Sequence, residues 1–316
     1  MQKIFISVAS FVDPYLPFTV QNACESAKHP ENLVFGVVDQ APDNRRKTLQ
    51  ALELSAEIRY IHIDPVESRG VCWARSLVQS LYQDEAYYLQ IDSHTYFEKD
   101  WDIRLIEQLK SLNDMHAKPI LSIYPYGFEF EEDRPVVKVR VGGLTTLVLR
   151  VKPNEALEGK NPVLHFRAEH QKIREPVLGF HLAGGFIFTF GQFVNEVPYD
   201  PRLYFHGEEQ SLAVRAYTHG WDIFHPPEIP LYHLYKQPEN AYTTHHWHKD
   251  WDQQRDYAWH ELRASAVERL IKLLYQQQDL GAYGVGSERT LQQFAEFSGI
   301  DYLRQTMNFE HLPKTL

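Results

Sequence analysis

An aspartate and a histidine, two residues apart, follow an apolar run in the segment Tyr87–Tyr96, YYLQIDSHTY. The run predicts a buried strand with Asp92 and His94 at its C-terminal end, which is where open α/β sheets bind ligands. Side chains two residues apart in an extended chain project to the same side. One carboxylate oxygen and one imidazole nitrogen suit Mn²⁺ or a similar divalent ion. The structural alternative is that Asp92 caps the next element and His94 lies on the surface.

Two arginines accompany a predicted helix start in the segment ESRGVCWAR, which ends at Arg75. Arg69 and Gly70 fall at the expected N-terminus, and Arg75 lies about two turns further on. A helix N-terminus beside an arginine favours a phosphate ligand. Alternatively, Arg75 pairs with a carboxylate or extends its side chain along the surface.

Adjacent carboxylates begin another predicted helix, at Glu208 and Glu209. Acidic side chains there complement the helix dipole, so capping is their structural interpretation. Adjacent residues of a regular helix do not face one site, so we expect at most one of them to be catalytic.

Histidine is abundant, with 16 residues, and half of them fall between His206 and His260. His233 lies on a short predicted strand between aromatic residues, a pattern typical of a hydrogen-bonded core histidine. His245, His246 and His248 have an irregular spacing for a zinc site and no accompanying cysteine. An aromatic lid over a ligand explains these three at least as well as a metal site does, and a zinc hydrolase is the least favoured function.

The elements expected to position these residues alternate between strand and helix over the first 120 residues. Asp13-Pro14 is typical of a helix start, with an N-cap acceptor followed by proline. The alternation predicts an α/β sheet with parallel crossovers. The expected strands are Lys3–Ser10, Asn32–Val38, Arg59–Ile63, Ala86–Ile91 and Ile120–Ile123, and the expected helices are Tyr15–Ala27, Ser68–Gln83 and Trp101–Leu112.

The later part of the chain is less regular. Val136–Val151 resembles a hairpin around Gly142-Gly143, and the polar residues 152–177 predict a surface excursion. Leu182–Phe190 predicts a buried strand with Gly184-Gly185 at its entry. From residue 237 the chain is rich in aromatic residues and histidine, and an amphipathic helix is expected over Trp251–Gln278. We therefore expect a catalytic domain over residues 1–236 and a helical extension packed on it over 237–316.

Composition restricts the function further. The 316 residues include 32 Lys and Arg against 42 Asp and Glu, a net charge of −10 that argues against a nucleic-acid partner. A few placed arginines still allow a small anionic ligand. Cys24 and Cys72 are too few for a disulfide framework, which favours a reducing cytoplasm. Neither a secretory leader nor a membrane-spanning segment is expected, so membrane insertion is not predicted.

Taken in order, these motifs resemble a family of GlcNAc-transferases typified by a cytoplasmic enzyme that modifies hydroxyproline on the protein Skp1. More distantly, they are similar to the polypeptide GalNAc-transferases. The matching pieces cover nearly the whole chain. They are Ile4–Ser10 with the following Asp-Pro helix, Ser68–Arg75, Gln90–His94, Gly184-Gly185, Phe205–Glu209 and Gly284–Arg289.

The resemblance implies a GT-A fold, a Rossmann-like nucleotide-binding α/β/α sandwich. In it, Asp92 and His94 hold Mn²⁺ (or Mg²⁺) on the diphosphate of a UDP-sugar, and His233 matches a third metal ligand. The remaining implied contacts follow the same order along the chain. Ser7, Ala9 and Asp39 would face uracil and ribose, and Arg69 and Arg75 would hold ribose or phosphate. Gly184 and Gly185 would allow close approach to the sugar, and Glu208 and Glu209 would lie near the donor sugar and the acceptor. Arg289 would fold back towards the diphosphate.

The implied reaction is a transfer, most simply of GlcNAc, to a hydroxyl of a protein or glycan with retention of the anomeric configuration. The departing UDP would accept the proton of the acceptor, and the protein would contribute positioning and charge stabilisation. If Glu208 or Glu209 is instead a general base, the reaction inverts. The alternative from another class is a non-catalytic module that binds a sugar or nucleotide on the same scaffold.

Overall fold

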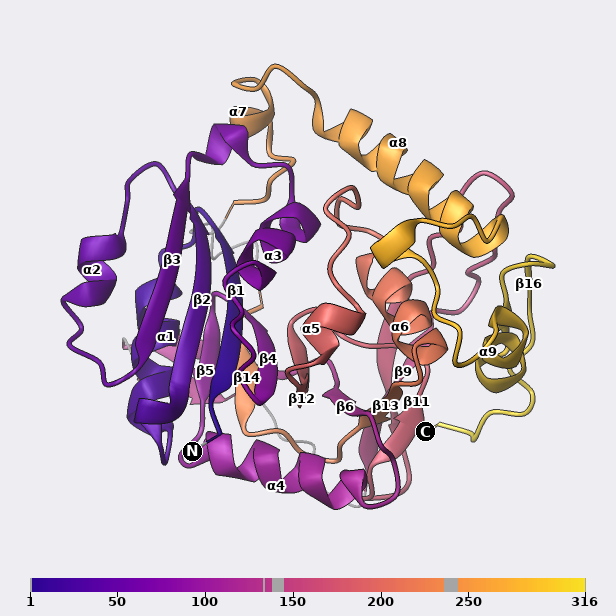
Figure 1. Cartoon of the computed structure of the whole chain (residues 1–316), viewed down its shortest axis with the longest axis horizontal. Helices are drawn as coiled ribbons and strands as arrows, with labels where there is room; N and C mark the ends of the chain where they lie inside the picture. The colour runs from indigo at the N-terminus through magenta and orange to yellow at the C-terminus, as the bar shows by residue number, and fades with distance from the viewer. Residues whose placement is uncertain (1, 133, 138–144, 236–243, 316) are drawn as a thin grey trace.

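A mixed sheet of eight strands forms the centre of the molecule, in the order β11-β13-β6-β12-β4-β1-β2-β3 (Figure 1). The computed structural model describes residues 2–132, 134–137, 145–235 and 244–315. The strands of this central sheet are β1 (Ile4–Phe11), β2 (Leu33–Gln40), β3 (Glu57–Ile63), β4 (Tyr87–Asp92), β6 (Pro119–Ser122), β11 (Val177–Gly179), β12 (Phe186–Phe190) and β13 (Asp222–His225).

The N-terminal half of the sheet is parallel, as its sequence predicts. β1 pairs in parallel with β2 and β4, and β2 pairs in parallel with β3. All eight residues of β2 are buried, which explains its continuous apolar run. The sheet is not parallel throughout, because β12 lies antiparallel between β4 and β6, and β11 is an antiparallel edge strand. The entry to β12 is thereby brought beside the C-terminal end of β4.

Helices cover both faces of the sheet. α1 and α4 contribute to the apolar cluster on one face, and α3 and α6 contribute to the cluster on the other. β1 supplies both clusters, with Ile4, Ile6 and Val8 on one face and Phe5 on the other. The helices of this part are α1 (Leu16–Ser26), η1 (Pro30–Asn32), α2 (Arg46–Gln50), η2 (Pro65–Glu67), α3 (Val71–Gln79), α4 (Trp101–Asn113), α5 (Phe193–Glu196) and α6 (Glu208–Thr218).

A smaller sheet has the strand order β5-β14-β7-β8. Its strands are β5 (Thr95–Phe97), β7 (Tyr126–Glu131), β8 (Arg134–Val137) and β14 (Leu231–His233). β5 follows β4 after a bend of two residues, and β14 pairs antiparallel with it, so that His233 lies opposite Thr95. This pairing brings the late strand next to the residues that end β4.

The middle of the chain differs from its sequence-based description. β9 (Thr146–Val151) pairs antiparallel with β10 (Phe166–Gln171), so the expected surface excursion over 152–177 contains a strand. The expected hairpin is also wrong in part, because β8 and β9 belong to different sheets. Gly142 and Gly143, its expected turn, lie outside the described residues. Each of the two strands pairs instead with its other neighbour along the chain, β8 with β7 and β9 with β10.

The expected helix over Trp251–Gln278 is interrupted. α7 (Lys249–Asp252) ends early, and the Asp252 carboxylate accepts a hydrogen bond from the Trp259 backbone N–H at 2.8 Å where α8 begins. The remaining C-terminal elements are α8 (Trp259–Leu270), the π-helical turn η3 (Ile271–Tyr275), η4 (Gly281–Tyr283), α9 (Leu291–Ser298), β15 (Ile300–Asp301) and β16 (Thr306–Met307).

The elements from α8 to β16 lie on the α6 side of the molecule, whereas α7 lies beside η2 (Figure 1). Leu270 and Leu274 of the α8–η3 segment and Phe294 of α9 belong to the same apolar cluster as Leu212 of α6. In the described part of the chain, no helix is both long and apolar enough to cross a lipid bilayer.

Candidate active site

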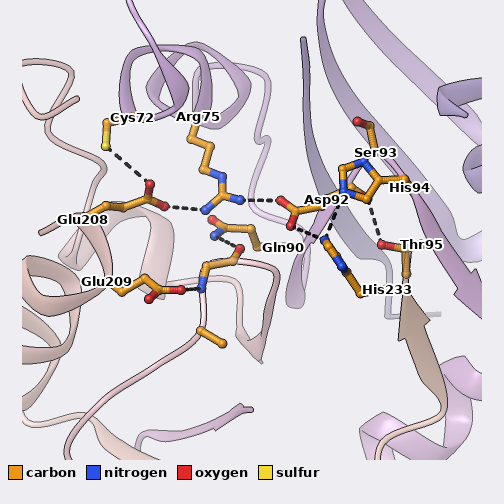
Figure 2. Close-up of polar contacts among 12 residues, drawn as sticks. Cys72, Arg75, Gln90, Asp92, Ser93, His94, Thr95, Glu208, Glu209 and His233 are labelled. Atoms are coloured by element: carbon orange, nitrogen blue, oxygen red, sulfur yellow. Dashed lines mark hydrogen bonds and ion pairs between the residues drawn. The ribbon is translucent and has the colours of Figure 1, made fainter. Parts of the chain in front are cut away.

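Three side chains predicted as metal ligands meet where β4 ends. Asp92 is the last residue of β4, His94 lies in the bend before β5, and His233 ends β14. His233 Nε2 is 3.0 Å from Asp92 Oδ2 and 3.0 Å from His94 Nε2 (Figure 2). One possible ligand atom from each of the three lies within 4.8 Å of the other two. One carboxylate oxygen and two imidazole nitrogens therefore point at a common position.

Charge at this position favours an ionised aspartate. Burial raises the pKa of Asp92, but the hydrogen bond to His233 and the Arg75 charge hold it well below its usual range. Burial lowers the pKa of His233, despite the hydrogen bond to Asp92. A carboxylate and a neutral imidazole are the protonation states in which both side chains bind a divalent cation.

Arg75 of α3 lies at the centre of a buried ionic network and is 3% exposed. Its Nη2 donates to Asp92 Oδ1 at 2.9 Å, and its Nη1 donates to a Glu208 oxygen (Figure 2). The same Nη1 donates to the Tyr199 hydroxyl. Sequence reasoning left open whether Arg75 contacts phosphate or a carboxylate, and the structure pairs it with two carboxylates. It therefore connects the end of β4 to the start of α6.

The two glutamates at the start of α6 have different environments. Glu208 is buried against Arg75, Tyr199 and Cys72, and burial raises its pKa. Glu209 Oε1 accepts the Gly184 backbone N–H at 2.6 Å, and its Oε2 accepts the Tyr124 hydroxyl at 2.9 Å.

Glu209 also lies 3.5 Å from His181 Nε2. Burial raises the pKa of Glu209, but His181, Gly184 and Tyr124 together hold it below its usual value. Both glutamates line one cavity, although adjacent residues of a regular helix are expected to face different directions, and the expectation that at most one is catalytic stays a prediction. The first turn of the helix presents both side chains to it.

Gly184 and Gly185 allow the entry to β12 to approach the ionic network closely. A Cβ at Gly185 would lie 2.9 Å from Asp92 Oδ2, and one at Gly184 would lie 2.8 Å from Arg75 Nη1. Gln90 of β4 holds this backbone by donating to the Gly184 carbonyl at 2.7 Å. Larger side chains at these two positions would collide with Arg75 or Asp92. Both glycines also line the cavity of the two glutamates.

Two cavities meet at Asp92. The first, which we call the strand-end pocket, is lined among others by Ala9, Phe11, Asp13, Gln40, His94 and Trp247. The second, the glutamate pocket, is lined among others by Arg75, Gly184, Gly185, His206, Glu208 and Glu209. Val71, Asp92 and Phe205 line both, so a ligand extended across Asp92 would occupy the two in succession.

Of the three residues predicted to face uracil and ribose, one lines a pocket and two do not. Ala9 lines the strand-end pocket, whereas Ser7 lies one pleat further into β1, is 1% exposed and lines neither pocket. Asp39 is fully buried and lines neither pocket, because its carboxylate accepts hydrogen bonds from Arg45 and Tyr60. Its neighbour Gln40 lines the strand-end pocket instead.

The two remaining arginines lie outside both pocket linings. Arg69 is exposed, with its guanidinium 5.2 Å from the centre of the Tyr257 ring. Arg289 lines a separate cavity and pairs with Asp222 at 2.8 Å, while its guanidinium lies 4.7 Å from the centre of the Tyr217 ring. The resemblance implies that Arg289 folds back towards the diphosphate, whereas in this structure Asp222 and Tyr217 hold its charged group at a separate cavity.

The three histidines at residues 245–248 have different surroundings, and their role as a lid stays a prediction. His245 stacks on Trp247, with ring centres 4.5 Å apart, and both line the strand-end pocket. His246 is 7% exposed, with Nε2 at 2.8 Å from the Ser68 carbonyl and Nδ1 at 2.9 Å from the Tyr204 hydroxyl. His248 accepts from the Asp250 backbone N–H at the start of α7.

Several residues of the site were not predicted from the sequence. Asp13 lines the strand-end pocket and its carboxylate contacts His94, although the sequence indicated only a helix start. Gln90, Tyr124, His181 and Tyr199 support the ionic network from separate elements. No spacing in the sequence connects them, because each approaches from a different strand or loop.

Comparison with known proteins places this site in context. The family model described as "Glycosyltransferase (GlcNAc)" matches residues 43–304. A search of curated protein sequences found no match. The structure of GalNAc-T7 with UDP, GalNAc and Mn²⁺ is similar over 99% of this chain, with a TM-score of 0.59 and 14% identity.

This chain spans 56% of the length of the GalNAc-T7 chain. Residues 1–349 of S. aureus TarS, in complex with UDP-GlcNAc, match 96% of this chain and 81% of the TarS chain, with a TM-score of 0.44 and 14% identity. The GT-A fold predicted from the sequence motifs is confirmed by the central sheet and its likeness to GalNAc-T7.

Proposed function

Because the chain belongs to the GlcNAc glycosyltransferase family, we propose that it transfers a sugar from a UDP-sugar to a hydroxyl group of a protein or glycan. N-acetylglucosamine is the proposed sugar, in keeping with the family description. The observation that carries the proposal is the convergence of Asp92, His94 and His233 at the junction of two cavities. The resemblance to the Skp1-modifying enzymes makes a hydroxyproline acceptor one candidate, and a cytoplasmic location stays a prediction.

The three converging side chains fit a divalent cation. Two imidazole Nε2 atoms lie 3.0 Å apart and close to one carboxylate oxygen, an arrangement that a shared cation stabilises. The oxygen and nitrogen donor set suits Mn²⁺, with Mg²⁺ as the alternative. When bound, the ion would neutralise charge on the diphosphate leaving group.

The two cavities suggest how donor and acceptor are arranged. We assign the nucleotide to the strand-end pocket, where Ala9 and Gln40 lie at strand ends and Phe11 and Trp247 offer aromatic surfaces. The sugar and the acceptor hydroxyl are assigned to the glutamate pocket. The diphosphate would then cross Asp92, which lines both.

Within the glutamate pocket, the acids are proposed to position rather than to attack. Glu208 is engaged by Arg75 and Tyr199, and Glu209 holds the Gly184 backbone N–H. Neither is a free general base, which supports a retaining transfer in which the leaving UDP accepts the acceptor proton. Analysis of the product anomer tests this point, since a base-assisted displacement gives the inverted product.

Thermal unfolding with UDP, GDP and UDP-sugars, each with and without Mn²⁺, tests the function. We expect UDP to stabilise the protein only with Mn²⁺, by about 2.7 kcal/mol at a hundred times its Kd. Asp92→Asn and His233→Ala should abolish this shift. His116→Ala is the matched control, because His116 also pairs with an aspartate, Asp222 at 2.9 Å, but lines neither pocket.

Sugar transfer, or UDP-sugar hydrolysis without acceptor, separates an enzyme from a binding module. An equal UDP shift with and without Mn²⁺ would contradict the metal site. Full transfer by both site variants in the presence of a chelator would contradict the proposed mechanism. Binding without turnover would instead support the non-catalytic alternative.

A further inference from the structure

The carboxylate of Asp13 contacts both the first helix and a proposed metal ligand. Asp13 lies between β1 and α1 and is 3% exposed. Its Oδ1 accepts the Tyr15 backbone N–H at 2.9 Å in the turn before α1, whose N-cap is Tyr15 and not the expected Asp13. Its Oδ2 lies 2.5 Å from His94 Nδ1 and accepts the Ser93 hydroxyl at 2.5 Å. The helix start therefore uses only one of the two carboxylate oxygens.

The second oxygen determines which nitrogen of His94 carries the proton. An ionised carboxylate accepts hydrogen bonds but cannot donate one. The His94 Nδ1 beside Asp13 must therefore be the protonated nitrogen, and the neutral ring carries its lone pair on Nε2. That Nε2 is the atom that lies 3.0 Å from His233 Nε2 at the proposed metal position.

Neighbouring contacts hold Asp13 and His94 rigidly against each other. Arg45 Nη1 donates to the Asp13 backbone carbonyl at 2.6 Å, while the rest of its guanidinium is bound by Asp39. On the other side, Thr19 of α1 donates to the Ser93 carbonyl at 2.8 Å and accepts the Thr95 N–H at 2.9 Å. The bend that carries His94 is thus fastened to α1 on both sides of that residue.

We propose that Asp13 is a positioning residue that fixes the tautomer and the ring orientation of His94 for the metal ion. The inference rests on the proposed metal site and adds a residue to it. Carboxylates that hold a metal-binding histidine through its other nitrogen typically change metal affinity 10- to 100-fold when they are removed. A residue that only holds the turn before α1 would change the stability of the protein without changing the tautomer of His94.

Titration of Mn²⁺ by electron paramagnetic resonance, without nucleotide, measures the metal affinity directly. Asp13→Asn should weaken Mn²⁺ binding about 10- to 100-fold. Asp102→Asn is the matched control, because Asp102 is 2% exposed and its two oxygens accept the Lys28 and His29 backbone N–H groups, at 2.7 and 2.9 Å. Its Mn²⁺ affinity should equal that of the wild-type protein.

Nitrogen chemical shifts of His94 provide a second test that needs no variant. In the metal-free wild-type protein, long-range ¹H–¹⁵N spectra should show His94 with a protonated Nδ1 and an unprotonated Nε2. The opposite tautomer, or equal Mn²⁺ affinity in wild type and Asp13→Asn, would overturn the role of Asp13 alone. Absence of Mn²⁺ binding to the wild-type protein would overturn the proposed metal site and the inference with it.

Discussion

Arg75 shows how a single side chain acquires its function from partners that are distant in sequence. Its buried guanidinium joins Asp92, 17 residues away, to Glu208, 133 residues away. A planar guanidinium with several donors can bridge two carboxylates, whereas an ammonium group is a single point charge. Burial makes the pairing obligatory, because an unpaired charge there is costly.

Arg75→Lys should therefore be strongly destabilising. We expect the free energy of unfolding to fall by about 3 kcal/mol, because one of the two carboxylates that the buried guanidinium bridges loses its partner. Arg104→Lys is the control, since Arg104 also bridges two carboxylates, those of Glu98 and Glu228, but with its side chain 31% exposed. Its loss should be about 1 kcal/mol or less. Equal losses in urea-induced unfolding of the two variants would refute the importance of the buried bridge.

At the scale of the residue, the sequence was informative about side chains close together in the chain. Asp92 and His94 were recognised from their position after an apolar strand, whereas His233 taken by itself resembled a core residue and became a ligand candidate only through the family resemblance. The pattern Asp13-Pro14 indicates a helix start, but nothing in the sequence indicates that Asp13 contacts His94. A contact across 81 residues leaves no periodic pattern.

At the scale of the element, the entry to β12 shows how a strand connection is shaped by the site. β12 runs antiparallel beside β4, so its first residues pass over the carboxylate that ends β4. Gly184 and Gly185 place no side chain beside this carboxylate. Glu209 accepts the backbone N–H of Gly184, and Gln90 donates to its backbone carbonyl. The backbone there is part of the wall of the site.

Gly185→Ala should disturb the aspartate without unfolding the protein. Its Cβ would lie 2.9 Å from Asp92 Oδ2, so the carboxylate must move. We expect Mn²⁺ affinity to fall about tenfold or more, measured by the same resonance titration. In Gly159→Ala, where the nearest atom to the new Cβ is Gln305 Oε1 at 3.5 Å, the affinity should be unchanged. Unaltered Mn²⁺ binding in Gly185→Ala would mean that Asp92 is not a ligand or that the strand entry shifts freely.

The elements expected from local patterns were the long and regular ones. The parallel strands β1 to β4 and helices α1, α3 and α4 follow apolar periodicity. The interrupted helix at α7 and α8 does not, because tertiary contacts fix Arg255 within the interruption. Arg255 donates to the Pro65 carbonyl at 3.1 Å and lies over the Phe11 ring. Tertiary packing overrides helix propensity in such segments.

At the scale of the whole molecule, buried histidines make stability depend on pH. Burial lowers the pKa of both His225 and His246 to about 4. In the unfolded chain these histidines bind a proton below about pH 6.5. Between pH 6.5 and 4 the unfolded state therefore binds more protons than the folded state, and stability falls as pH falls through this range.

Urea-induced unfolding at pH 7, 6 and 5 measures this dependence. We expect His225 to account for a loss on the order of 2 kcal/mol by pH 5. His225→Gln, which keeps a donor for the Ser122 carbonyl, should flatten the curve, whereas His29→Gln should not, because the side chain of His29 is 47% exposed. A curve for His225→Gln parallel to the wild type would contradict the assignment.

The sequence by itself determined the alternation of strands and helices, the GT-A class and the strand end at which Asp92 and His94 lie. Apolar periodicity and residue spacing encode the alternation and the strand end locally, whereas the GT-A class follows from the resemblance of the ordered motifs to a known family. The tertiary structure decided the partners of Arg75, the placement of both glutamates in one cavity, the position of Arg289 away from Asp92 and the contact of Asp13 with His94. Strand order and sheet pairing bring these groups together over 80 to 140 residues. These long-range contacts depend on the packing of the whole chain, so no local sequence pattern could have specified them.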